Sequence, residues 1–123
     1  MTQTPPDGIP AIFEGKLFRF AWRYAAPDGA PIGWVARFEA PAGDKAVIPF
    51  FERNGAGWRA KGAPEPRPLF NGHELAVAPA DAAAFVVEGE KCAAALASLG
   101  MTCTTSPGGA RAAGKADWSP LAR

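Results

Sequence analysis

The hydrophobic pattern changes character part-way along the chain, and this change does most to set the fold class. Residues 16–24 alternate large apolar side chains with basic ones, the period of two that is typical of a half-buried strand. Residues 33–38 and 45–51 predict two more strands, and Pro49 favours an edge position for the last of them. Because turn sequences separate the three segments, they predict an antiparallel β-meander.

A continuous apolar run, Ala84-Phe85-Val86-Val87, breaks this alternation. Such a run predicts a strand that is buried on both faces of a parallel sheet. Residues 90–99 predict a helix that ends at Gly100, and residues 101–105 predict a second short strand. Together they predict a compact, right-handed βαβ unit. The apolar face expected for the helix consists of Cys92, Ala95, Leu96 and Leu99.

These elements predict an α+β fold, an antiparallel β-meander followed by a βαβ unit. We expect a flexible tail over residues 1–12, a β-rich part over residues 13–83 and a second part over residues 84–123. Within the β-rich part, Asn71 is the expected N-cap of one helical turn. Thirteen prolines and fourteen glycines are consistent with short elements and many turns.

Charge and cysteine content limit the classes of function. The net charge of +1 gives no overall nucleic-acid signature, although residues 53–67 are locally basic and include Trp58. The chain has no Cys-x-x-Cys pair, so a structural zinc site is not expected. Cys92 and Cys103 are expected to be small core residues in a reducing compartment. Neither a leader nor a long apolar run is visible, so we expect a cytoplasmic protein without a membrane partner.

The sequence Glu88-Gly89-Glu90-Lys91 lies where the buried strand is expected to turn into the helix. Ligands of open α/β sheets bind at the carboxyl ends of strands. Gly89 permits a tight turn, and carboxylates at a helix N-terminus are stabilised by the helix dipole. Glu88 and Glu90 could therefore hold a divalent cation or act as a base. Acidic residues in a first helical turn are, however, common without any such role.

The run from Phe85 to Leu96, with Val86-Val87-Glu88-Gly89-Glu90-Lys91 at its centre, resembles the first motif of Toprim domains. Together with Thr104-Thr105-Ser106-Pro107-Gly108-Gly109 it is similar to the variant found in phage- and plasmid-type DNA primases and primase-helicases. A looser likeness extends over residues 18–120. The resemblance implies that the βαβ unit is half of a Toprim, Rossmann-like, domain. It also implies an enzyme that makes RNA primers on single-stranded DNA from nucleotides.

The resemblance assigns roles to individual residues. It implies that Glu88 acts in acid/base or metal-dependent phosphoryl chemistry, with Glu90 as a second ligand of Mg²⁺. Gly89 is the turn glycine, and Lys91 could pair with a phosphate or with Glu90. By charge and aromatic neighbours alone, the candidates for nucleic-acid contact are Arg37, Arg59 and Lys61.

The sequence departs from the family in one respect. Toprim domains have a later Asp-x-Asp pair that completes the magnesium site, but the only acidic residue after Gly109 is Asp117. Two-metal phosphoryl transfer needs several carboxylates. We therefore interpret the chain as a primase fragment that is inactive alone and works with the rest of its polypeptide or with a helicase. Two alternatives stay open: a non-catalytic nucleic-acid-binding accessory domain of replication, and a Toprim nuclease.

Other patterns favour ordinary structural roles. Residues 109–115 have the spacing of a phosphate-binding loop, but Ala116 stands where Ser or Thr is needed, so a flexible basic tail is expected. His73 has no partner at metal-ligand spacing and is expected at the surface or at a cap. An aromatic row could stack on bases but is expected to pack the core of the sheet; it comprises Phe18, Phe20, Trp22 and Tyr24.

Overall fold

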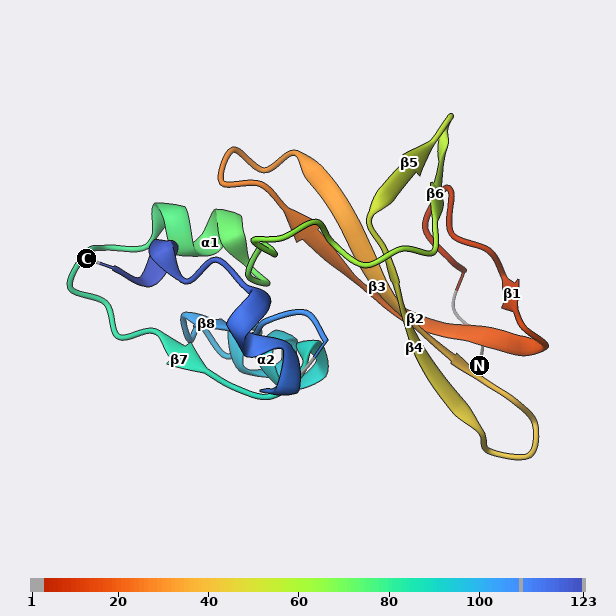
Figure 1. The fold of residues 1–123 in the computed structure, drawn as a ribbon. Coiled ribbons are helices and arrows are strands. Elements are labelled where there is room, and N and C mark those ends of the chain that lie inside the picture. Colours follow the sequence, from red (N-terminus) through yellow and green to blue (C-terminus); the bar gives the residue numbers. More distant parts are fainter. Residues whose placement is uncertain (1–3, 109, 123) are drawn as a thin grey trace. The chain divides into compact units, whose positions relative to one another are not determined.

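The computed structural model describes residues 4–108 and 110–122, which pack as two compact units (Figure 1). The first unit spans residues 1–23 and 33–63, and the second spans residues 24–32 and 64–123. The hairpin over residues 16–39 is thus divided between the two units, because its turn, residues 24–32, belongs to the second unit. The boundary expected near residue 83 refers to a family domain rather than to packing, and it stays a prediction.

The first unit is built on a four-stranded antiparallel sheet. Its strands are β1 (Ile12–Phe13), β2 (Lys16–Ala25), β3 (Pro31–Glu39) and β4 (Lys45–Phe50), and they follow one another in chain order. The predicted meander is therefore confirmed, with β1 as an additional short strand. Pro49 lies in the last strand of the sheet, as its missing N–H group requires.

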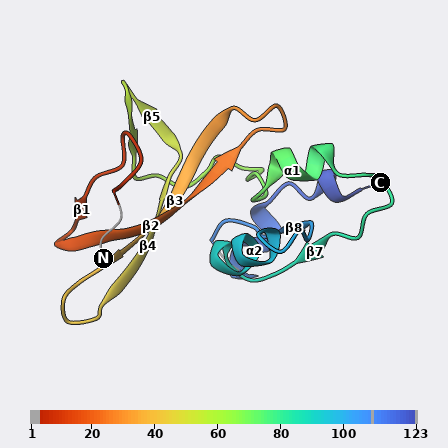
Figure 2. The ribbon, with the colours of Figure 1, turned by 180° about the vertical axis from the view of Figure 1, so that it is seen from behind.

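A separate hairpin follows the sheet, formed by β5 (Glu52–Asn54) and β6 (Gly57–Arg59) (Figure 2). The hairpin turns at Gly55, which has a positive φ of 63°. Its second strand also contacts the N-terminal segment, because the Trp58 N–H group donates to the Gly8 carbonyl over 3.1 Å.

The core of the first unit is aromatic and lies on one face of the sheet. The alternation of β3 places Ala36 and Phe38 on this face, and Phe50 of β4 joins them. The rings of Phe18 and Phe38 meet edge-on with centroids 6.0 Å apart. Ile9 belongs to the same cluster. Ile9 thus supplies apolar area to a small core, and the flexible tail expected over residues 1–12 stays a prediction.

The aromatic row of β2 does not pack as one face. Phe18 and Tyr24 are buried, but Phe20 is 40% exposed and Trp22 is partly exposed. Ala21 packs against the core instead. Burial along β2 therefore does not follow strict alternation. The expectation that all four aromatic residues fill the core is wrong.

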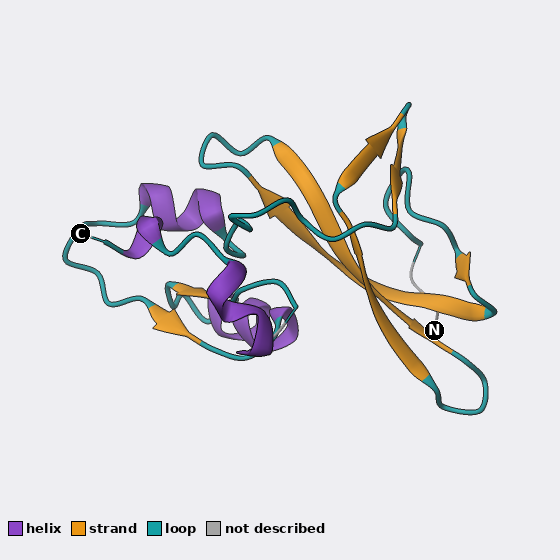
Figure 3. Cartoon of the chain, in the orientation of Figure 1, coloured by secondary structure: helices purple, strands orange, loops and turns teal. Residues whose placement is uncertain are grey.

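The second unit holds all the described helices (Figure 3). The predicted βαβ unit is present, because β7 (Phe85–Val86), α2 (Glu90–Ala97) and β8 (Cys103–Thr104) follow in sequence and the two strands pair in parallel. The other elements are the helix α1 (Gly72–Val77) and two 3₁₀ turns, η1 (Ala110–Lys115) and η2 (Ser119–Leu121). Alpha+beta is therefore the correct class.

The predicted burial of β7 is wrong. Phe85 is 46% exposed and Val86 is 53% exposed. The described sheet has only two strands, with β7 beside β8. A parallel strand becomes buried when neighbouring strands and helices cover it, and here the described residues supply only one neighbouring strand.

The predicted buried face of α2 is also wrong. Its buried residues are Glu90 and Ala93, whereas Cys92 is exposed and Leu99, beyond the helix end, is 76% exposed. Cys103 is the only one of the two cysteines in the core, where its thiol donates to the Ala93 carbonyl. Short alanine-rich helices give a weak periodic signal, so one buried glutamate is enough to shift the inward face.

α2 ends at Ala97, two residues before the predicted end, and the chain leaves the last turn at Gly100 as predicted. Gly100 has a φ of +86°, and its N–H group donates to the Ala97 carbonyl over 3.0 Å. The Met101 N–H group donates to the Leu96 carbonyl over 3.2 Å. These are the two hydrogen bonds of a Schellman motif.

The start of α1 is held by β8 rather than by a side-chain cap. Asn71 occupies the N-cap position, but its backbone is left-handed (φ 62°) and it makes no capping bond. Its amide donates to the Cys103 carbonyl over 2.9 Å, and the Thr104 hydroxyl donates to the Phe70 carbonyl over 2.6 Å. The segment before α1 therefore lies along β8.

The C-terminal segment packs, contrary to the expectation of a flexible tail. The Trp118 indole N–H group donates to the Ala113 carbonyl, and Arg67 forms a parallel bridge with Ala116. In both views α1 and η2 lie side by side (Figures 1 and 2). No helix among the described residues has the length and apolar character needed to span a bilayer.

Gly33 provides a test of packing in the first unit. A methyl group added at Gly33 would lie against the ring of Phe51, 2.7 Å from its Cγ atom. We expect Gly33→Ala to lower the free energy of unfolding by about 1–3 kcal/mol, as other overpacked sites do. Urea denaturation followed by tryptophan fluorescence measures this. Gly57→Ala is the control, because its nearest contact would be 3.6 Å. Equal midpoints for the two variants would contradict the prediction.

Candidate functional site

Glu88 lies just beyond the carboxyl end of β7, as the sequence predicts. Its side chain is exposed and lines a small hollow of about 200 Å³. Thr105 and Ser106, which follow β8, line the same hollow, as does Trp118. Because β7 and β8 are parallel, residues that follow them reach the same end of the sheet. One accessible carboxylate and two hydroxyl-bearing residues therefore meet here.

Gly89 makes the sharp turn between Glu88 and α2. Its φ of +81° is a conformation that favours glycine, and it occupies the N-cap position of α2. Its N–H group donates to the Thr105 Oγ1 atom over 3.1 Å. The side chain of Thr105 thus satisfies the backbone N–H group of the N-cap residue itself.

Glu90 takes a different position from Glu88. It is only 8% exposed, and its Oε2 atom accepts a hydrogen bond of 2.7 Å from the hydroxyl of Tyr24. Tyr24 is fully buried, and its ring contacts that of Phe70 with centroids 5.3 Å apart. Burial and the Glu90 carboxylate both raise the pKa of Tyr24 far above its usual value. Tyr24 is thus a neutral donor to a buried carboxylate.

The two candidate magnesium ligands therefore differ in what they can do. Glu88 is accessible, whereas Glu90 is buried against Tyr24. Over residues 4–108 and 110–122, no three His, Cys, Asp or Glu side chains form a group that could hold a metal ion. Magnesium binds proteins through one or two carboxylates and several waters, so Glu88 fits as one ligand. The described residues alone do not fit a two-metal site.

Lys91 is exposed near the start of α2. The other basic candidates lie in the first unit, where each pairs with a carboxylate. The Arg37 Nε atom is 2.9 Å from a Glu39 oxygen. Arg59 and Lys61 both pair with Glu52. The side chains of Arg59 and Lys61 are exposed, and surface pairs of this kind are weak, so these two cations remain able to exchange the carboxylate for a phosphate.

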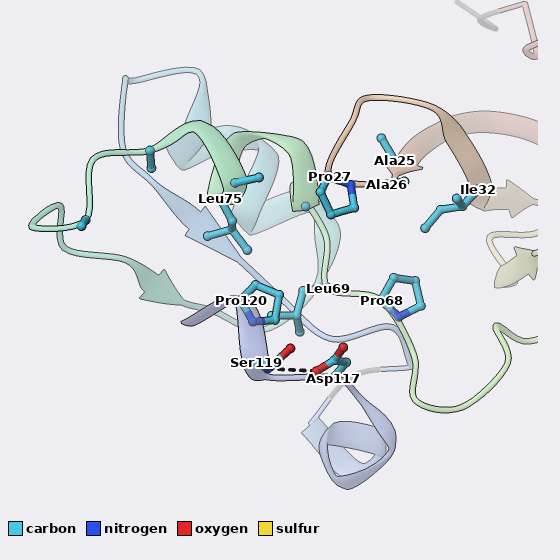
Figure 4. A pocket seen from close by; sticks show the side chains of 14 residues that line it. Ala25, Ala26, Pro27, Ile32, Pro68, Leu69, Leu75, Asp117, Ser119 and Pro120 are labelled. Carbon is cyan, nitrogen blue, oxygen red and sulfur yellow. Dashed lines mark hydrogen bonds between the residues drawn. The ribbon is translucent and has the colours of Figure 1, made fainter. Parts of the chain in front are cut away.

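The sequence interpretation missed Tyr24 as a functional neighbour of the motif. Tyr24 was assigned to the aromatic row of β2, and 66 residues separate it from Glu90. No local pattern reveals a contact of that range. The second feature that was missed is a larger cavity in the same unit, lined by residues of the β2–β3 turn, α1 and the C-terminal segment (Figure 4).

No protein-family model, no curated protein and no solved structure matches this chain.

Tyr24 gives the site a measurable signature. We expect Tyr24→Phe to lower the free energy of unfolding by about 1–3 kcal/mol at neutral pH, because it leaves the buried Glu90 carboxylate without this donor. The folded pKa of Tyr24 lies above the unfolded value of 10.0. Its contribution is therefore complete below pH 10 and is lost as the pH rises further. Above pH 10 the difference between wild type and variant should shrink by about 1.4 kcal/mol per pH unit.

Denaturant unfolding at several pH values measures both effects. Tyr24 is the only tyrosine, so tyrosinate absorbance reports its ionisation directly. Titration of the folded protein near pH 10 would show that the hydroxyl is not held by Glu90.

Proposed function

We propose that this chain carries the first part of a Toprim-type catalytic domain of a DNA primase, with Glu88 as its reactive carboxylate. The observation that carries the proposal is the place of Glu88, accessible at the carboxyl end of β7 in a parallel βαβ unit. This is where open α/β sheets bind ligands. The motif Glu88-Gly89-Glu90-Lys91 adds the likeness to primases.

On this proposal Glu88 supplies one ligand to Mg²⁺ or accepts a proton from the attacking hydroxyl. The remaining acidic ligands come from outside the described residues. Template and nucleotides are the substrates, and the rest of the polypeptide or a helicase is the partner. We expect no primer synthesis by the 123-residue chain alone. Template-dependent primers made by this chain with magnesium would contradict that expectation.

The catalytic part of the proposal is tested in the longest polypeptide that the gene encodes. We expect Glu88→Gln to lower ribonucleotide incorporation on single-stranded DNA by about 10²–10⁴-fold, the usual contribution of a positioned acid or base. The matched control is Glu74→Gln, an exposed carboxylate of α1 outside the hollow, which should leave incorporation unchanged. Equal activity of Glu88→Gln and wild type would remove Glu88 from the chemistry.

A second candidate function, nucleic-acid binding without catalysis, is favoured by two features of the first unit. Its sequence holds eight basic and five acidic residues, whereas the second unit holds five and seven. Phe20 and Trp22 lie with ring centroids 5.1 Å apart, and both are accessible. Exposed Arg19 and Arg23 flank them along β2. Accessible aromatic rings beside cationic side chains suit stacked bases and their phosphates.

Binding is tested by the fluorescence anisotropy of a labelled oligothymidylate at low salt. Because stacking on one aromatic ring contributes about 1–3 kcal/mol, we expect Phe20→Ala and Trp22→Ala each to weaken binding roughly 5- to 150-fold. Leu17→Ala is the control, since Leu17 is an exposed apolar residue of the same strand. A double Arg59→Ala, Lys61→Ala variant should weaken binding and lower its salt dependence. Absence of binding by wild type at low salt would rule out this candidate.

A further inference from the structure

The larger cavity of the second unit has the size of a small-molecule site. Its volume is about 590 Å³, within the range of about 300–1,000 Å³ that is usual for ligand pockets. It lies among the β2–β3 turn, α1 and the segment around η2 (Figure 4). Most of the side chains that line it are aliphatic, and those larger than alanine are Pro27, Ile32, Pro68, Leu69, Leu75 and Pro120.

Hydrogen bonds hold each wall of this cavity in place. The His73 ring nitrogen Nδ1 lies 2.9 Å from the Pro27 carbonyl oxygen, which ties α1 to the β2–β3 turn. The Arg67 N–H group donates to the Lys115 carbonyl, and the Asp117 N–H group donates to the Arg67 carbonyl, each over 2.7 Å. The C-terminal wall is therefore fixed beside Pro68. A preformed cavity of this kind loses little free energy to ordering when a ligand binds.

Asp117 is the only charged residue in the described lining. Its Oδ1 atom accepts a hydrogen bond of 3.0 Å from the Ser119 N–H group, which fixes the carboxylate at one end of the cavity (Figure 4). Hydrogen bonds from the Ser119 hydroxyl and N–H group lower the pKa of Asp117. The carboxylate is therefore ionised at neutral pH. Among residues 4–108 and 110–122, no lysine, arginine or histidine lines the cavity to neutralise it.

We propose that this cavity binds a molecule with an aliphatic body and one protonated nitrogen, and that Asp117 contacts the nitrogen. The aliphatic walls exclude water from the body of the ligand, and the single carboxylate selects its charge. Anionic amphiphiles are disfavoured by the same carboxylate. The site goes beyond the proposed primase function, because none of its lining residues belongs to the hollow beside Glu88.

Three ligands with the same hydrocarbon chain test this proposal: hexylammonium, hexan-1-ol and hexanoate. Each is titrated into the full chain, and backbone amide shifts are followed by two-dimensional NMR. For hexylammonium we expect a dissociation constant on the order of 1 mM, given what a ligand of this size can contribute. Hexan-1-ol should bind about 10-fold more weakly, and hexanoate more weakly still. Equal binding of all three, or no shift at the lining residues, would overturn the proposal.

Variants distinguish the contribution of the Asp117 charge to binding from the contribution of the cavity volume. Asp117→Asn should reduce hexylammonium binding to the level of hexan-1-ol and leave hexan-1-ol unchanged. Asp81→Asn is the control for lost charge, because Asp81 is exposed and outside the lining. Ala76→Phe should fill the cavity and abolish binding of both ligands. Val77→Phe, one residue further along α1 and outside the lining, should not. Unchanged hexylammonium binding in Asp117→Asn would remove Asp117 from the site.

Discussion

The hydrogen bond between Tyr24 and Glu90 is the contact on which the second unit most depends. It joins a strand of the β2–β3 hairpin to the first residue of α2 across 66 positions of sequence. A carboxylate that is only 8% exposed loses much of its hydration, so it needs a donor in the interior. Once the Glu90 side chain is held inward, the start of α2 is fixed. The positions of Gly89 and Glu88, which come directly before it in the chain, are then fixed as well.

This constraint explains why Glu88 and Glu90, only two positions apart, have different environments. Glu90 faces the interior, and the positive φ of Gly89 redirects the chain, so that Glu88 remains exposed. Thr105 accepts the Gly89 N–H group and thereby ties the turn to the end of β8. The turn from β7 into α2 thus uses the carboxylate of Glu90 for stability and presents that of Glu88 to the hollow. A motif with two glutamates need not contain two ligands.

What could be predicted from the sequence followed from local patterns. Alternation and turn residues gave the meander, and Gly100 gave the end of α2, because each depends on neighbours in the chain. The place of Glu88 at a strand end was predicted for the same reason. The burial of Phe85 depends on how many strands cover β7, and the partner of Glu90 lies far away in sequence. The aliphatic cavity is formed by several segments that are far apart in the sequence, so the pattern of any one segment does not predict it.

The proposed primase function has two parts, nucleic-acid binding and phosphoryl chemistry, and their electrostatic requirements differ. The basic excess of the first unit attracts phosphates without further help. The second unit has an acidic excess and an exposed Glu88, so a phosphate that approaches the hollow meets like charge. Phosphoryl chemistry at Glu88 therefore requires a cation that binds the carboxylate and the phosphate together. On the proposed function, nucleic-acid binding would need only the first unit, whereas chemistry at Glu88 would need further ligands that complete a cation site.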